Sequence, residues 1–237
     1  MDIVLFTAII IVASVLQTST GFGFSILATP FLLLLFEPRE AIQINLILSL
    51  FISLALIRKI YKDIDFGIVQ RFTISSAAGL PIGMAVFLWI DIVKLKLGVS
   101  VIILLLTVLL IFKLRLTRTK KRDLGAGGIS GMLTTSIGMP GPPLLLYFSG
   151  TETKKETLRA TTLAFYLFIY LVSLLIQVTF AGTSATIWLW SAFALPLVFA
   201  GMYAGQLLFR WISPGLFRLF TYVILLFTGL YLLVENL

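Results

Sequence analysis

Two polar phrases, each set inside an apolar stretch, most constrain how this chain can fold. The first runs from Leu16 to Phe24 (LQTSTGFGF) and the second from Leu133 to Pro143 (LTTSIGMPGPP). Their hydroxyls, glycines and prolines free backbone polar groups from regular helix. A bilayer tolerates such groups only where protein buries them or where they line a cavity. We therefore expect two interrupted helical elements, one near the start of the chain and one in its middle.

The composition predicts a helical membrane protein that crosses the bilayer several times. Of the 237 residues, 59% are hydrophobic and 12% are charged, and the mean hydropathy is +1.10. The net charge of +8 comes from cations in short loops between apolar runs. We therefore interpret these cations as determinants of membrane topology and not as a sign of nucleic-acid binding. The absence of Cys and His removes thiol chemistry, imidazole relays and the usual zinc sites. We expect no enzyme and no cofactor.

The first interrupted element is too long for one crossing, and each of its parts is short for a full span. The first comprises apolar segments at about 3–17 and 24–36, which together would span roughly 50 Å as one straight helix. The second comprises about 124–134 and a segment that begins near Leu144 and ends near 148. Two interpretations remain open for each element: a re-entrant hairpin with its tip in mid-membrane, or two short tilted spans.

Three apolar helices are predicted after each interrupted element. They lie at about 41–57, 66–90 and 97–112, and at about 160–180, 186–209 and 217–234. The two halves also match in sequence. Thr18-Ser19-Thr20-Gly21 matches Thr135-Ser136-Ile137-Gly138 at an offset of 117 (135 − 18). At an offset of 122 (201 − 79), a second set of residues matches: Gly79, Gly83, Phe87, Trp89, Ile90 and Lys96 with Gly201, Gly205, Phe209, Trp211, Ile212 and Arg218.

We therefore predict an all-α polytopic membrane protein built of two repeats, although chance similarity between apolar sequences is the alternative. The first repeat covers 1–113, a basic cytoplasmic linker covers 114–123, and the second repeat covers 124–237. Each repeat consists of a broken or re-entrant helix pair followed by three transmembrane helices. Internal repeats of this length are typical of secondary transporters.

The loop charges predict that the repeats are inverted. If the basic run at 113–123 is cytoplasmic and each broken element crosses an even number of times, the basic loops at 58–62, 154–159 and 210–218 are also cytoplasmic. The uncharged loop at 181–184 is then outside. Each half crosses an odd number of times, so both termini are extracytoplasmic in the plasma (inner) membrane. Lys94 and Lys96 do not fit this scheme.

Inverted repeats would bring the two breaks together from opposite faces. Helices that begin after each break would point their N-termini, with unsatisfied N–H groups, at the meeting place, which favours an anion. The alternative is that Ser, Thr and Gly only pack helices closely. Asn45 and Thr162 would either reach the ligand or cap a neighbouring backbone. The expected anion-site residues are Thr18, Ser19, Thr20, Gly21, Gly23, Ser25, Asn45, Thr134, Thr135, Ser136, Gly138, Gly141 and Thr162.

Other polar residues receive simpler interpretations. The Gly-x-x-x-Gly segments at Gly79 and Gly201 predict close helix contacts. Arg71 either attracts an anion or reaches to the cytoplasmic interface. Arg39 and Arg159 flank the broken elements, as loop charges or at a pathway mouth. No acidic residue falls in the middle of a predicted span, where a proton relay would place one.

The paired motifs and the two-half plan resemble the sulfite exporter TauE/SafE family of membrane transporters, also called TSUP. The resemblance covers essentially the whole chain, and its most specific parts are Gln17–Pro30, Thr134–Tyr147 and Arg159-Ala160-Thr161-Thr162. It implies transport of a small sulfur-containing anion, such as sulfite, thiosulfate or an organosulfonate like sulfoacetate. We expect a secondary carrier that works by alternating access, with the anion and the lipid bilayer as its partners. An anion channel and a non-transporting scaffold are the competing hypotheses.

Overall fold

The computed structural model describes residues 3–89, 91–111, 119–149, 153–211 and 214–235, and these ranges contain helices and short connections but no strand. The expectation of an all-helical chain is confirmed. The elements follow one another in this order: α1 (Ile3–Thr20), α2 (Phe24–Leu35), α3 (Pro38–Ile60), η1 (Tyr61–Asp63), α4 (Phe66–Trp89), α5 (Ile92–Ile111), α6 (Lys120–Ile137), α7 (Gly141–Ser149), α8 (Lys155–Ala181), α9 (Ala185–Trp211) and α10 (Pro214–Glu235).

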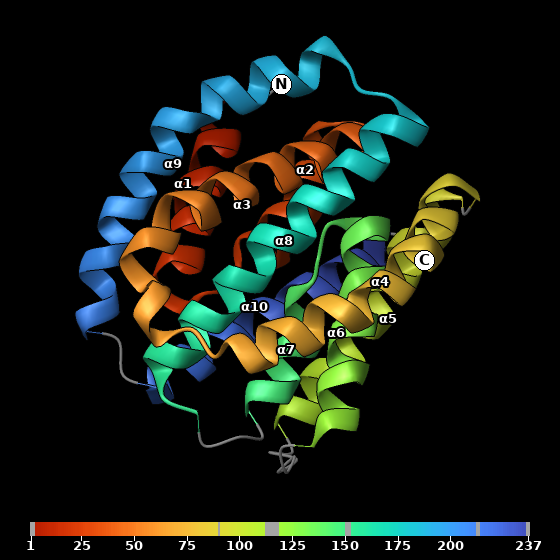
Figure 1. The fold of residues 1–237 in the computed structure, drawn as a ribbon. Helices are drawn as coiled ribbons and strands as arrows, with labels where there is room; N and C mark the ends of the chain where they lie inside the picture. Colours follow the sequence, from red (N-terminus) through yellow and green to blue (C-terminus); the bar gives the residue numbers. More distant parts are fainter. Residues whose placement is uncertain (1–2, 90, 112–118, 150–152, 212–213, 236–237) are drawn as a thin grey trace.

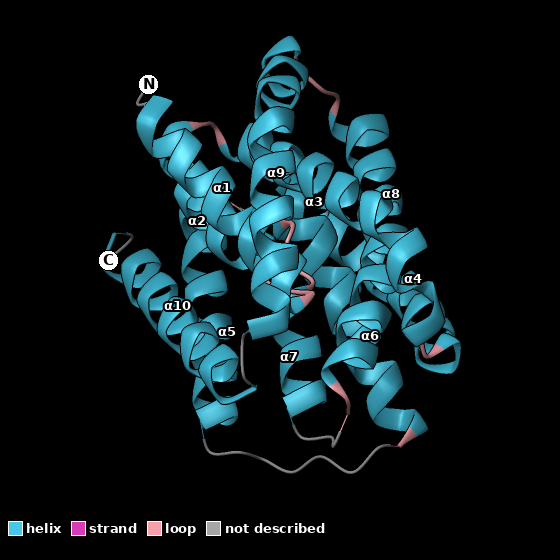
Figure 2. Ribbon diagram, turned by 90° about the vertical axis from the view of Figure 1, so that its left-hand side faces the viewer, coloured by secondary structure: helices cyan, strands magenta, loops and turns pink. Residues whose placement is uncertain are grey.

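Several of these helices are long and apolar enough to cross a bilayer. Among the described residues there are five such candidates, at 3–20, 38–63, 66–89, 155–181 and 185–209. Helix α2 is apolar but shorter. In Figures 1 and 2 the connection from α8 to α9 lies at the top, while the start of α6 and the end of α7 lie at the bottom. The chain is therefore a multi-pass membrane protein with helices running between two poles.

The first interruption is shorter than the sequence indicated. Helix α1 does not end at residue 17 but continues to Thr20, because its hydroxyls bond back to the preceding turn. Ser19 Oγ donates to the Val15 carbonyl at 2.7 Å, and Thr20 Oγ1 donates to the Leu16 carbonyl at 2.6 Å. Only 21–23 leave the helix. There Gly21 and Gly23 have φ values of 85° and 108°, which residues with a Cβ rarely adopt.

The second interruption also differs from its predicted bounds. Helix α6 continues to Ile137 because Thr134 and Ser136 bond back to carbonyls of the preceding turn, at 2.5 Å and 2.8 Å. Gly138 then ends the helix with φ 72°. Helix α7 begins at Gly141 and not near Leu144, because the two prolines that follow fit a first helical turn, where an N–H has no partner to lose.

Most other helices begin before the residue that hydropathy predicted. Helices α3, α5, α6 and α8 begin at Pro38, Ile92, Lys120 and Lys155, whereas their apolar runs begin at about 41, 97, 124 and 160. An apolar run marks the part of a helix that lipid or protein buries, and a polar first turn extends beyond it. The predicted positions 90, 112–118 and 212 lie outside the described residues.

Glycine faces pack the helices of the two halves against each other. Helix α4 packs on α6 and α9 packs on α1, while α3 packs on α8 and α5 on α10. A Cβ at Gly79 would lie 2.0 Å from the Gly128 carbonyl oxygen, and one at Gly205 would lie 2.7 Å from the Val15 carbonyl oxygen. The prediction that the Gly-x-x-x-Gly segments make close helix contacts is confirmed. Each covers the broken element of the opposite half.

Candidate anion-binding site

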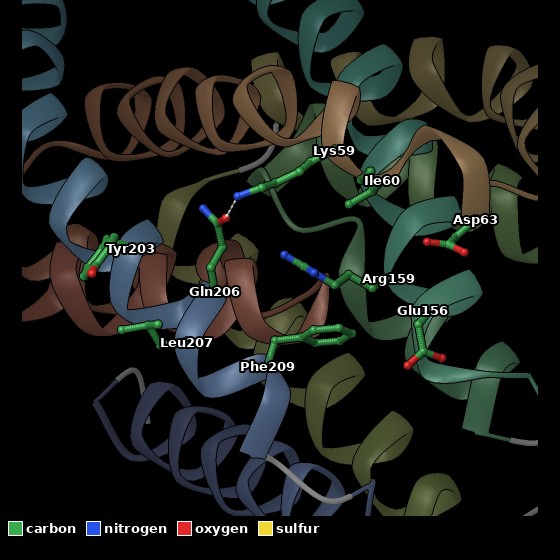
Figure 3. A pocket seen from close by; sticks show the side chains of 9 residues that line it. All are labelled: Lys59, Ile60, Asp63, Glu156, Arg159, Tyr203, Gln206, Leu207 and Phe209. Carbon is green, nitrogen blue, oxygen red and sulfur yellow. Dashed lines mark hydrogen bonds between the residues drawn. The ribbon is translucent and has the colours of Figure 1, made fainter.

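A cavity of about 490 Å³ opens where the ends of α3 and α9 meet the start of α8. Figure 3 shows the Arg159 side chain crossing it, with the guanidinium turned toward Gln206 and away from Glu156. The lining combines basic, acidic and apolar side chains: Lys59, Ile60, Asp63, Glu156, Arg159, Tyr203, Gln206, Leu207 and Phe209.

Arg159 is a buried cation. Its exposed fraction is 8%, and its Nε has no hydrogen-bond partner. The guanidinium carbon lies 4.4 Å from the centre of the Phe209 ring, on which Lys155 Nζ also rests at 4.9 Å. Among the described residues, the ion pair that forms joins Arg71 and Asp123 and does not include Arg159. A buried charge without a counter-charge is unfavourable, so an anion in this cavity would be stabilised by Arg159.

The first interruption positions Arg159. A Cβ at Gly21 would lie 2.8 Å from Arg159 Cα and 3.3 Å from its Cγ, so the turn of the break packs directly on the first turns of α8. Only a residue without a side chain permits this approach. Arg159 therefore stands over the break and inside a cavity. Arg39 is exposed on the first turn of α3.

A second cation connects two walls of the cavity. Lys59, in the last turn of α3, donates a short hydrogen bond to Gln206 Oε1 on α9. In Figure 3 the Lys59 ammonium and the Arg159 guanidinium lie on the side of Gln206, and the carboxylates of Asp63 and Glu156 lie on the other side. The positive part of the cavity is therefore the part nearest α9, and that is where an anion would be attracted.

Most of the predicted hydroxyl ligands donate their protons within the protein. Ser19, Thr20, Thr134 and Ser136 bond to carbonyls of their own helices. Thr135 Oγ1 donates to the Gly131 carbonyl of its own helix and also lies 3.0 Å from Ser173 Oγ. Two members of the set differ: the hydroxyls of Thr18 and Thr162 are fully buried and have no partner in the structure.

The first break and the last turn of α6 contact α8 at different levels. Gly21 packs on Arg159, and Thr135 meets Ser173, which is 14 positions further along the helix (173 − 159). At 1.5 Å per residue this separation is about 21 Å along the axis. Gly21 and Thr135, which both belong to the expected anion-site residues, therefore lie at different levels of α8. Asn45 caps the C-terminal end of α6, because its Nδ2 donates a hydrogen bond to the Gly138 carbonyl at 2.8 Å.

Between these levels the helices that follow the breaks come together. Tyr170 donates from its hydroxyl to Ser25 Oγ on α2 at 3.3 Å. A Cβ at Gly141, the first residue of α7, would lie 3.0 Å from the Tyr166 hydroxyl and 3.0 Å from Ile26 Cδ1. Of the expected site residues, Ser25 thus contacts Tyr170, and Gly141 lies next to Tyr166. Both tyrosines are fully buried, and the sequence interpretation missed them although their spacing of four places both on one face of α8.

The two helix N-termini are unequal donors. The first N–H groups of a helix have no partner inside it, and in α2 these belong to Phe24, Ser25 and Ile26, because the Leu27 N–H already donates to the Gly23 carbonyl at 3.0 Å. Helix α7 begins Gly141-Pro142-Pro143, and proline has no N–H. Backbone coordination of an anion would therefore depend more on α2 than on α7.

Within the described part of the chain, one arginine forms an ion pair with a carboxylate. Arg71 on α4 forms an ion pair with Asp123 on α6, whose side chain is 4% exposed. Arg71 thus holds α4 and α6 together, a role that neither sequence interpretation included. In the described ranges no three His, Cys, Asp or Glu side chains gather as metal ligands.

Comparison with known proteins identifies the family of the chain. No curated protein and no solved structure matches the chain. The family model described as "Sulfite exporter TauE/SafE" matches residues 6–232, which include both interruptions, the cavity and all ten helices at least in part. The chain therefore belongs to the sulfite exporter TauE/SafE family of membrane transporters.

Proposed function

We propose that this protein is a secondary transporter that moves a small sulfur-containing anion across the plasma membrane by alternating access. The candidate substrates are sulfite, thiosulfate and organosulfonates such as sulfoacetate. The observation that carries the proposal is Arg159, a buried guanidinium that has no carboxylate partner among the described residues and crosses a cavity next to a helix break. Sulfonate and sulfite oxygens accept charge-assisted hydrogen bonds from such a group.

The packing of the two halves supports inverted repeats. Helices at corresponding places contact the opposite half in the same way, with α4 on α6 and α9 on α1. Asn45 on α3 caps the break at Gly138, and Arg159 on α8 packs on the corresponding Gly21. We propose repeats at 1–113 and 124–237, joined by the basic linker 114–123, with both termini extracytoplasmic. The cavity then faces the cytoplasm.

The anion would enter from the cavity and pass inward along α8. Arg159 and Lys59 attract it, and the buried hydroxyls of Thr18 and Thr162 offer donors next to the break. Because Gly21 packs on Arg159 while Thr135, in the last turn of α6, meets Ser173, we propose that the first break lines the inner half of the pathway and the last turn of α6 lines the outer half. In this state the inner half is open, and rocking of one repeat against the other would open the outer half.

Uptake into proteoliposomes tests the proposal. The purified chain should exchange labelled sulfite or sulfoacetate for unlabelled anion inside the vesicles. Arg159→Gln should reduce the flux at least about tenfold, since a charged hydrogen bond contributes on the order of 1.5–3 kcal/mol. Arg39→Gln, which removes an exposed arginine on α3, is the matched control and should leave the flux unchanged.

Two results would contradict the proposal. Large unitary currents without saturable exchange would indicate a channel instead of a carrier. Equal flux by wild type and Arg159→Gln would remove Arg159 from the pathway. Thr18→Val and Thr162→Val extend the test, because valine keeps the shape of threonine and removes only the hydroxyl.

A further inference from the structure

The hydroxyl of Tyr166 is a buried donor that nothing in the structure uses. The residue is fully buried, and its oxygen has no hydrogen-bond partner. Aromatic rings surround it: Phe22 lies edge-on at 6.4 Å between ring centres, and Tyr170 lies at 5.0 Å. A phenol in such surroundings normally finds a partner. The open donor therefore indicates a ligand position.

The unused hydroxyl points at the place where two helices begin. A Cβ on Gly141, the first residue of α7, would lie 3.0 Å from the Tyr166 oxygen. The same Cβ would lie 3.0 Å from Ile26 Cδ1, and Ile26 is the third residue of α2. Two helix N-termini with their positive dipole ends thus flank one buried hydroxyl.

Ser25 adds a second donor at this place. The Ser25 hydroxyl accepts a hydrogen bond from the Tyr170 hydroxyl at 3.3 Å. The Ser25 hydroxyl can therefore still donate a hydrogen bond of its own to another acceptor. Ser25 is the second residue of α2 and is 1% exposed, so its backbone N–H belongs to the unsatisfied first turn of that helix. The cluster of Ser25, Gly141, Tyr166 and Tyr170, which we call the central hydroxyl cluster, offers donors to an anion.

We propose that the central hydroxyl cluster is an occluded binding site for a singly charged oxyanion group, such as a sulfonate or hydrogen sulfite. Tyr166 and Ser25 donate from their hydroxyls, and the first turn of α2 donates from its N–H groups. The inference rests on the proposed transport function. It places the bound anion between the cytoplasmic cavity and the outer half of the pathway. Tyr166 lies seven residues beyond Arg159 on α8, about 10 Å further in.

The chemistry of the cluster explains why the group carries a single charge. Its donors are phenol, alcohol and amide, all neutral, and its other neighbours are the apolar Phe22 and Ile26. The electrostatic free energy of moving an ion from water into such a site rises with the square of its charge. Neutral donors therefore compensate a monoanion far better than a dianion such as sulfate, so among the candidate substrates this site favours hydrogen sulfite and sulfonate groups over thiosulfate.

Tyr166→Phe tests the site because it removes one oxygen and keeps the ring. We expect methanesulfonate to raise the melting temperature of the purified wild-type protein, and sulfate at the same concentration and ionic strength to raise it much less. In Tyr166→Phe the affinity for methanesulfonate should fall at least about tenfold, as expected for a lost hydrogen bond to a charged group. Tyr61→Phe, at an exposed tyrosine of η1, should retain wild-type affinity.

Transport measurements separate this inference from the function on which it rests. In proteoliposomes Tyr166→Phe should raise the KM for sulfite, with methanesulfonate as a weaker competitor than in wild type. Unchanged KM and unchanged methanesulfonate affinity in Tyr166→Phe, while Arg159→Gln abolishes flux, would overturn the site and leave the transporter intact. Equal protection by sulfate would overturn the single-charge selectivity.

A second variant covers the case in which Tyr166→Phe does not fold. Ser25→Ala removes the other hydroxyl donor and should also weaken methanesulfonate binding, while Thr29→Ala, one turn further along α2 and also buried, should not. Wild-type protein that shows no stabilisation by methanesulfonate at any concentration would overturn the proposal, whatever its transport activity.

Discussion

Asn45 Nδ2 donates a hydrogen bond of 2.8 Å to the carbonyl oxygen of Gly138, so a side chain of the first half caps the break of the second. The bond is buried, and the carbonyl at a helix C-terminus has no partner in its own helix. Gly138 has positive φ, and a Cβ there would lie 2.7 Å from Asn45 Nδ2. The geometry of the second interruption therefore depends on one amide.

We predict that Asn45→Ala destabilises the protein and impairs transport. The free energy of unfolding should fall by about 1–3 kcal/mol, because a buried carbonyl loses its donor. Gln43→Ala is the matched control: it removes a similar bond, from Nε2 to the Gly182 carbonyl at 2.9 Å, at a loop away from both breaks. Thermal unfolding in detergent should show comparable losses for the two variants, but only Asn45→Ala should lower the flux. Equal flux losses would contradict a specific role at the break.

Gly83→Ala should separate α4 from α6. Its Cβ would lie 2.2 Å from the Met132 carbonyl oxygen and 3.0 Å from Thr135 Cβ, and these are backbone and branched atoms that cannot move aside alone. We expect a loss of more than about 3 kcal/mol or no folded protein. Gly125→Ala on α6, where a Cβ meets nothing within 4 Å, should be neutral or stabilising by up to about 1 kcal/mol. Melting temperatures of the pair check this.

Gly21→Ala should combine two penalties. The backbone conformation at φ 85° is unfavourable for alanine, by about 1 kcal/mol or more, and the Cβ would lie 2.8 Å from Arg159 Cα. Gly182→Ala has the first penalty alone, since φ is 77° and nothing lies within 4 Å. Unfolding measurements should therefore give a clearly larger loss for Gly21→Ala. Losses of the same size would mean that the contact with Arg159 has no energetic weight.

The Arg71–Asp123 pair should behave as a buried ion pair. Arg71→Met leaves a 4% exposed carboxylate without its partner, which should destabilise the fold by about 3–5 kcal/mol. The double variant Arg71→Met with Asp123→Leu should recover most of that loss, because no charge remains buried. A double-mutant cycle on thermal unfolding measures the coupling. Additive effects would show that the two side chains contribute independently.

Hydropathy and the two polar phrases predict the helices well but place their ends poorly. The breaks were expected to begin at Thr18 and Thr135, whereas the chain leaves the helix only at Gly21 and Gly138. A serine or threonine near a helix end can face a ligand or bond to a carbonyl of the previous turn, and sequence alone does not distinguish the two. The glycines mark where each helix ends, because the positive φ of the break is readily adopted only by glycine.

The candidate site was less predictable than the fold. Arg159 reads as an ordinary loop charge in the sequence, and its burial arises from Gly21, Phe209 and Lys59, which come from three other parts of the chain. Tyr166 and Tyr170 read as two more aromatic residues of an apolar helix. The function of such residues depends on tertiary contacts that have no local sequence pattern.

The glycine face of α9 that covers α1 also sets an order of events during biosynthesis. Gly201 and Gly205 pack against Ser14, Val15 and Thr18, although most of the chain lies between them. A ribosome must therefore synthesise nearly the entire protein before α1 meets α9, although its other neighbours α2 and α3 follow it directly. Until then the small-residue surface of α1 faces lipid or the insertion machinery, and a chain truncated before residue 201 would be a natural substrate for membrane quality control.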